Sequence, residues 1–298
     1  MTRRIVAALD RWWFTAAPAR RPALVRIVVG AYTLWYLRGR IRMLQEISRT
    51  DPELFRPVGM ARPLVRPVPP EVVRATTFGV VAANLAFVLG WRHRVSGPLF
   101  AALLLWTISY RNSWSMVFHN DNVLVLHAAV LGLTASADAL SVDALTGRAA
   151  PTAGPHWRYG WPLNLMNAVT AASYFLAGVA KVKGPLGWGW AGGEALRSQV
   201  AMDGLRKEVF AKGAPPLGAR LYPHVGVHRA LAVGSLAAEL GAPLALADRR
   251  VLRLWSVGAF AMHWGIYAVM GITFRHQMSG VMYGPAFDLE RLMPRRPS

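Results

Sequence analysis

Long apolar segments alternate with short, mostly basic segments along the whole chain. A helix needs roughly 20 apolar residues to cross a bilayer, and each of these segments is close to that length. They lie at 23–37, 75–91, 97–110, 122–137, 162–180, 230–247 and 254–274. A weaker eighth segment, 276–287, is too short to cross, so it predicts a re-entrant or half helix that protein must bury. The pattern predicts an all-α fold, a polytopic transmembrane bundle of about seven or eight spans.

The N-terminal stretch 1–21 is basic and contains tryptophan. Asp10 and Arg11 interrupt its apolar runs, and no convincing cleavage site follows, which argues against a signal peptide. Tryptophans such as Trp12 and Trp13 prefer the headgroup level of a membrane. We therefore expect an interfacial N-terminal helix, with a disordered basic tail as the alternative.

Two connections, 38–74 and 181–229, are longer than a simple helix hairpin requires. Long ordered connections are commonly lids or binding loops. We expect the 181–229 loop, which carries Trp188, to cover a site at one membrane face. The chain shows no internal repeat and no soluble-domain pattern, so we expect one membrane domain over 1–298.

Composition agrees with a membrane protein, since 54% of the residues are hydrophobic and only 16% are charged. A soluble domain carries about 25% charged residues. The net charge of +19 resides in short segments between apolar runs, where membrane lipids with anionic headgroups are the expected partner and nucleic acid is not. The absence of cysteine excludes disulfides and thiol nucleophiles. Richness in arginine, alanine, glycine and proline favours a bacterial source, and hence a multi-pass protein of the cytoplasmic (inner) membrane.

Ionisable groups inside apolar segments are costly in lipid and therefore mark functional candidates. A first group lies in FHNDNVLVLH (118–127). Asp121 or Asn122 would serve as an ordinary helix cap, but capping does not account for four polar residues in a row. His127, further along the same segment, either faces the same cavity or bonds a neighbouring helix.

A second group closes the segment YFLAGVAKVK (174–183). Tyr174 and Lys181 are seven residues apart, so they share one helix face. A buried lysine loses its charge more readily and can then act as a base near neutral pH. The alternative is that Lys181 and Lys183 extend to lipid phosphates at the end of the span.

Two further candidates are His263 and Glu239, which lie in the middle of late apolar segments. A lone histidine in a membrane helix is often only a structural hydrogen-bonding group. Glu239 could neutralise Arg26, Lys181 or a histidine, and the sequence leaves that choice open. Phosphate-loop and dinucleotide motifs are absent. The histidines of HVGVH (224–228) lack a third ligand nearby, so we predict no metal site.

Five motifs in order resemble one known family. They are LVRIVVG (24–30), NDNVLVL (120–126), ALSVDAL (139–145), WPLNLMNAVTAASYFLAGVAKVKGPLGWGWAGGEAL (161–196) and HWGIYAVMGITF (263–274). Together they are similar to the HTTM membrane domain, which is the fold of the vitamin K-dependent γ-carboxylase and of many bacterial membrane proteins. The resemblance runs over most of the chain.

The resemblance implies a chemistry and a set of site residues. The stretch YFLAGVAK is similar to the carboxylase motif that ends in the catalytic lysine, which places Lys181 as the base and Ala180 at the first lysine of that motif. His263 looks like the late-span histidine, and Asp121 falls where the carboxylase has another active-site histidine. Implied co-reactants are reduced menaquinone or vitamin K hydroquinone, O2 and CO2. Cofactor-binding candidates are Tyr174, Asn122, His127, Trp188 and Glu239.

Three functions follow from this resemblance. The first is a quinol-dependent oxygenase, epoxidase or carboxylase-like enzyme, which the retained lysine, tyrosine and histidine favour. The second is a non-catalytic or partner-dependent membrane protein that assists maturation or export of a secreted peptide, together with a separate soluble partner. Asp121 and the short chain after the last span favour this second function. The third is a lipid or quinone carrier whose polar groups line a pathway.

Overall fold

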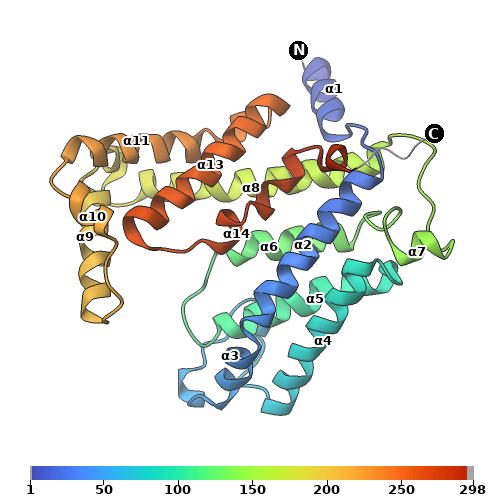
Figure 1. The fold of residues 1–298 in the computed structure, drawn as a ribbon, viewed down its shortest axis with the longest axis horizontal. Coiled ribbons are helices and arrows are strands. Elements are labelled where there is room, and N and C mark those ends of the chain that lie inside the picture. Colours follow the sequence, from blue (N-terminus) through green and yellow to red (C-terminus); the bar gives the residue numbers. More distant parts are fainter. Residues whose placement is uncertain (1, 294–298) are drawn as a thin grey trace. The chain divides into compact units, whose positions relative to one another are not determined.

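The computed structural model describes residues 2–293, and every regular element in that range is a helix (Figure 1). The α-helices are α1 Thr2–Trp13, α2 Arg20–Arg38, α3 Ile41–Glu46, α4 Pro70–Leu89, α5 His93–Asn112, α6 Asp121–Gly132, α7 Val142–Leu145, α8 Trp157–Lys183, α9 Glu194–Val209, α10 Pro216–Leu221, α11 Val225–Leu240, α12 Ala242–Ala245, α13 Arg249–Met270 and α14 Arg275–Met278. Six short 3-10 helices join them: Ile47–Arg49, Pro52–Leu54, Gly59–Ala61, Gly187–Gly192 (η4), Val281–Ala286 (η5) and Leu289–Leu292. The all-α prediction is confirmed.

The described residues divide into two compact units. The first unit contains the residues up to 166 together with those from 287 onward. The second unit contains residues 167–286. Helix α8 passes from the first unit into the second, so its C-terminal part, with Tyr174 and Lys181, belongs to the second unit.

Each of the seven predicted apolar segments lies largely in a helix. These helices are α2, α4, α5, α6, α8, α11 and α13. Within residues 2–293, α4 and α8 are the two that are long and apolar enough to cross a membrane by length and composition. Helix α6 is apolar but contains 12 residues, which is about 18 Å of helix. The N-terminal segment also forms a helix, α1, as predicted.

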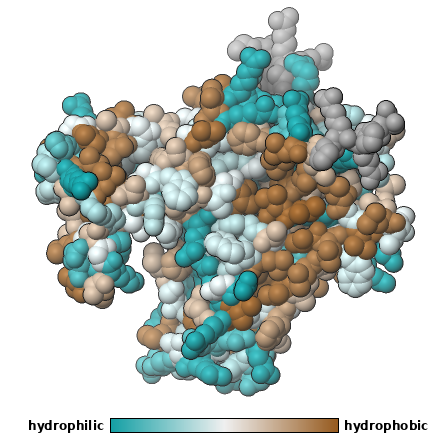
Figure 2. Space-filling view, viewed as in Figure 1, coloured by the Kyte–Doolittle hydropathy of each residue, from teal (hydrophilic) through white to brown (hydrophobic). Residues whose placement is uncertain are grey.

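Large apolar side chains remain exposed on the helices of the first unit. Figure 2 shows apolar side chains gathered on the face over α2. Helix α2 exposes Val28 and Trp35, and α4 exposes Phe78, Leu85 and Leu89. Exposed apolar patches of this kind mark interaction surfaces, and for a helix of this composition a lipid environment fits them best.

The two long connections differ from simple loops. Residues 38–74 contain α3 and three short 3-10 helices, and residues 181–229 contain η4, α9 and α10. Helix α9 begins after Gly193, whose positive φ of 87° suits a glycine. The charged residues of α9 lower its mean hydropathy below that of a membrane span, so a search for apolar segments does not detect this helix.

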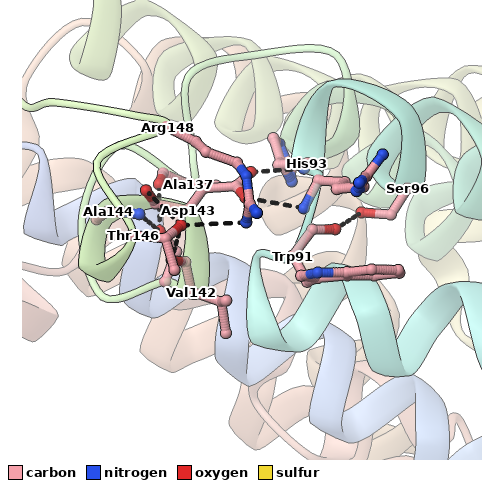
Figure 3. A network of polar contacts seen from close by, with 11 residues as sticks. Trp91, His93, Ser96, Ala137, Val142, Asp143, Ala144, Thr146 and Arg148 are labelled. Carbon is pink, nitrogen blue, oxygen red and sulfur yellow. Dashed lines mark hydrogen bonds and ion pairs between the residues drawn. The ribbon is translucent and has the colours of Figure 1, made fainter.

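Asp143, in the motif ALSVDAL (139–145), forms hydrogen bonds with the start of α5 (Figure 3). Its carboxylate accepts hydrogen bonds from the backbone N–H groups of Arg92 at 2.9 Å and His93 at 2.7 Å. Ser141 in turn caps α7 by accepting from the Ala144 N–H at 2.9 Å. Asp143 therefore stabilises the turn between α4 and α5, because it satisfies free N–H donors at the N-terminus of α5.

Replacing Asp143 with alanine is expected to destabilise the protein by about 1–2 kcal/mol, because one buried and one part-buried N–H donor at the start of α5 lose their acceptor. Thermal unfolding of the purified protein in detergent measures this change. Asp51→Ala is the matched control, since Asp51 caps a three-residue 3-10 helix at an exposed position. Equal unfolding temperatures for the two variants would contradict the capping role of Asp143.

Candidate functional site

An aromatic cluster in the second unit contains two predicted site residues, Tyr174 and His263. Tyr174 comes from α8, His263 and Trp255 from α13, and Tyr283 from η5. The Tyr174 and Tyr283 hydroxyl groups are 2.5 Å apart, and the Tyr174 hydroxyl is 3.2 Å from Nδ1 of His263. The Trp255 ring meets the Tyr174 ring edge-on at 5.0 Å. Three separate elements therefore converge on one hydrogen-bonded group.

The hydrogen bonds of His263 fix its proton. Nδ1 lies 2.8 Å from the backbone oxygen of Ala259. A carbonyl oxygen only accepts, so in the neutral ring Nδ1 carries the proton and Nε2 carries the lone pair. The Phe274 ring packs edge-on against the imidazole at 5.0 Å. His263 is thus buried, and in its neutral form Nε2 is the ring nitrogen that can accept a hydrogen bond.

Lys181, near the end of α8, forms an ion pair with Glu239 of α11. Its Nζ donates to both carboxylate oxygens, with Oε2 at 2.5 Å. Nζ also lies 4.9 Å from the centre of the Trp190 ring, a cation–π arrangement. The lysine side chain is 27% exposed and that of the glutamate 8%. The lysine side chain is therefore partly exposed while its partner is buried, and Lys181 is the partner of Glu239 that the sequence left open.

The ion pair lies near the aromatic cluster. Lys181 is close enough to His263, and Glu239 to Tyr174, for their charges to act on these groups through space. Gly178 permits the close approach of α8 and α11, because a Cβ at this position would lie 3.0 Å from the Cβ of Glu239. The structure thus brings together Tyr174, Lys181, Glu239 and His263, four of the residues that the sequence proposed, from three helices.

Asp121 belongs to the first unit, where it forms a buried ion pair with Arg111. Its Oδ1 accepts from the Tyr36 hydroxyl at 2.8 Å, and Arg111 Nη1 also donates to that hydroxyl at 3.1 Å. The residue at the N-cap position of α6 is Asn120, which makes no capping hydrogen bond through its side chain. Asp121 therefore serves an ion pair with α5 rather than a helix cap.

The remaining predicted residues occupy three different settings. His127 is fully buried in the first unit, with Nε2 3.1 Å from the backbone oxygen of Met166. Asn122 is exposed on α6 of the same unit. Trp188 lies on η4 in the second unit, and 69% of its surface is exposed. A cofactor-binding role for these three stays a prediction.

The model of one family, the HTTM domain, matches residues 15–211, about two thirds of the chain. The chain belongs to the HTTM-domain family. HTTM domains are membrane-associated, so this is a membrane protein of the vitamin K-dependent carboxylase-like family. The match includes Asp121, Tyr174 and Lys181, while Glu239 and His263 lie beyond it. Neither the curated proteins nor the solved structures gave a match.

Sequence reasoning missed three aromatic residues of the HTTM protein's second unit: Trp190, Trp255 and Tyr283. Tyr283 lies in the short VMYGPA helix, which is buried as the prediction for 276–287 required. For Tyr283, the available signal in the sequence was an aromatic residue in an apolar segment too short to span a membrane. Across the described part of the chain, no three histidine or acidic side chains gather to hold a metal ion.

Proposed function

We propose that this HTTM protein is a multi-pass enzyme of the bacterial cytoplasmic membrane that acts on a quinol and oxygen, with Lys181 as the base. The observation that carries the proposal is the convergence of Lys181, Glu239, Tyr174 and His263. Ionisable groups inside membrane proteins are costly and usually functional, and here they gather around one lysine whose side chain is partly exposed.

The multi-pass arrangement has its support in the seven helices that coincide with the apolar segments. Their exposed apolar side chains, such as Phe78 on α4 and Leu176 on α8, suit contact with lipid. We propose that six of these helices, α2, α4, α5, α8, α11 and α13, span the membrane, that the 12-residue α6 enters it only part of the way, and that α14 and η5 form a re-entrant segment. A single membrane domain then includes both compact units.

The residues of the second unit fit a reduced menaquinone or vitamin K hydroquinone. Such a molecule has a flat aromatic head with two hydroxyl groups. The rings of Trp255 and Phe274 offer apolar faces and edges beside Tyr174 and His263. Nε2 of His263 offers a lone pair to one hydroxyl group, and the amine of Lys181 is a second polar partner. These two groups would be the polar partners of the two hydroxyl groups in the proposed site.

Lys181 would take a proton from a hydroxyl group in this arrangement. The amine can do so after its own extra proton has passed to Glu239, to which Nζ already donates. His263, held by Ala259, would orient the same group through Nε2. When bound, the quinol would supply the reducing equivalents that turn it and O2 into the quinone epoxide and water. A carboxylase-like reaction would in addition remove a proton from the γ-carbon of a glutamate side chain, and CO2 would take the place of that proton. A catalytic role for Asp121 has its support in the family resemblance alone, since Asp121 lies in the first unit.

The test is aerobic product analysis of the full-length protein in lipid vesicles with reduced menaquinone. We expect wild type to form the quinone epoxide in an oxygen-dependent reaction, and His263→Asn to form much less. The asparagine amide nitrogen can replace Nδ1 as the donor to the Ala259 carbonyl, but the side chain lacks the lone pair at Nε2. Absence of both quinol binding and epoxide in wild type would refute the enzyme proposal.

A second candidate, a non-catalytic protein that assists a secreted peptide or a soluble partner, has one observation in its favour. Lys181 and Glu239 satisfy each other's charges, as they would if they only fastened α8 to α11. Under this alternative, co-purification with a small secreted peptide would replace quinol turnover as the positive result. Quinol binding without turnover would instead indicate a quinone carrier.

A further inference from the structure

Helix α9 exposes a row of large apolar side chains. Met202, Leu205 and Val209 follow one another at helical spacing, and Phe210 directly follows the helix. Their surfaces are between 62% and 72% exposed. The opposite side of the helix is buried, with Val200 at its centre. An apolar row of this size on an otherwise polar helix requires a partner.

The second unit places α9 across the ends of its apolar helices. At the start of α9, Gly193 approaches the backbone of Arg229 in the first turns of α11. At its other end, Lys207 donates to the backbone oxygen of Met270, the last residue of α13, at 2.5 Å. Figure 1 shows α9 running across the direction of α11. If α11 and α13 span the membrane, then α9 lies parallel to the membrane surface, at the level of the headgroups.

The charges around the apolar row are those that suit anionic headgroups. The acidic residues of this region are already engaged: Asp203 by Lys207, Glu194 by Arg197, and Glu208 by a backbone N–H. Lys212 and Arg220 are exposed, and within residues 2–293 neither has an acidic partner. An apolar row beside free basic side chains is the pattern of a helix that lies in a membrane interface.

We propose that α9 is an interfacial membrane anchor, which inserts Met202, Leu205, Val209 and Phe210 among the acyl chains of an anionic leaflet while Lys212 and Arg220 bind lipid phosphates. The exposed Trp188 on η4, which follows the end of α8, lies where aromatic residues commonly meet the interface. The proposal requires a membrane but not the quinol chemistry.

The absence of cysteine allows a direct test on the full-length protein, because single cysteines can be labelled without background. Leu205→Cys carries a fluorophore in the apolar row, and Gln199→Cys carries the same fluorophore at an exposed polar position of α9. Both are placed in vesicles of phosphatidylcholine with phosphatidylglycerol. We expect the Leu205 label to be quenched by a lipid-borne nitroxide and shielded from aqueous iodide, and the Gln199 label to show the reverse order.

The basic residues give a second readout. We expect the lipid-borne quenching at Leu205 to fall in vesicles of phosphatidylcholine alone, and to fall equally in anionic vesicles when Lys212→Gln and Arg220→Gln are combined. A Leu205 label as open to iodide as the Gln199 label would overturn the proposal. A Leu205 label shielded from both quenchers would also overturn it, since a protein partner or a second copy would then cover the row.

Discussion

Asp121→Ala is expected to lower the free energy of unfolding by about 3–5 kcal/mol, because it removes one partner of a buried ion pair and leaves the other charge without compensation. The side chains of Asp121 and Arg111 are only 1% and 7% exposed. The substitution also removes the acceptor of the Tyr36 hydroxyl. Thermal unfolding in detergent or in vesicles measures the loss.

Two controls test whether the loss of stability comes from the buried ion pair. Glu46→Ala breaks the exposed pair with Arg42 on one helix and should leave the unfolding temperature unchanged. The double variant Arg111→Ala, Asp121→Ala should lose less stability than the two single variants added together, since neither charge is then left alone. Strict additivity would show that the two residues stabilise the first unit independently and would contradict the ion-pair account.

The hydropathy pattern predicted the apolar helices of the chain and missed the polar ones. The segment 75–91 lies in α4, and the short segment 276–287 lies in α14 and η5, which are largely buried. Helix α9 escaped notice because its charges hide its apolar row from any search for a span. Its boundaries at Gly193 and Phe210 follow from backbone geometry, which composition does not reveal.

The sequence predicted which residues belong to the candidate site, but it did not predict which charged residues form the ion pair. Lys181 and Tyr174 lie on one helix, so their spacing alone predicts a shared face. Glu239 is 58 residues from Lys181, and one sequence carries no information on which charges of different helices meet. The sequence therefore named Arg26, Lys181 and the histidines as possible partners of Glu239, and only the structure shows that the partner is Lys181.

Lys181→Ala is expected to lower the rate of quinol turnover by roughly 10²–10⁴-fold, the usual contribution of a positioned general base. The same substitution leaves Glu239 buried without its ammonium partner, so lost stability would be confused with lost catalysis. Lys181→Arg separates the two effects. Arginine can keep the ion pair with Glu239, but it does not give up its proton in proteins and therefore cannot act as the base.

We therefore expect Lys181→Arg to unfold near the wild-type temperature, to bind quinol and to form almost no epoxide. Glu239→Gln should retain binding and shift the pH dependence of turnover, because the amine loses the carboxylate to which its proton passes. Oxygen-dependent epoxide formation across a pH series measures both variants. If Lys181→Arg turns over like wild type, Lys181 only joins α8 to α11, and the base must be sought among the other groups of the cluster, beginning with Nε2 of His263.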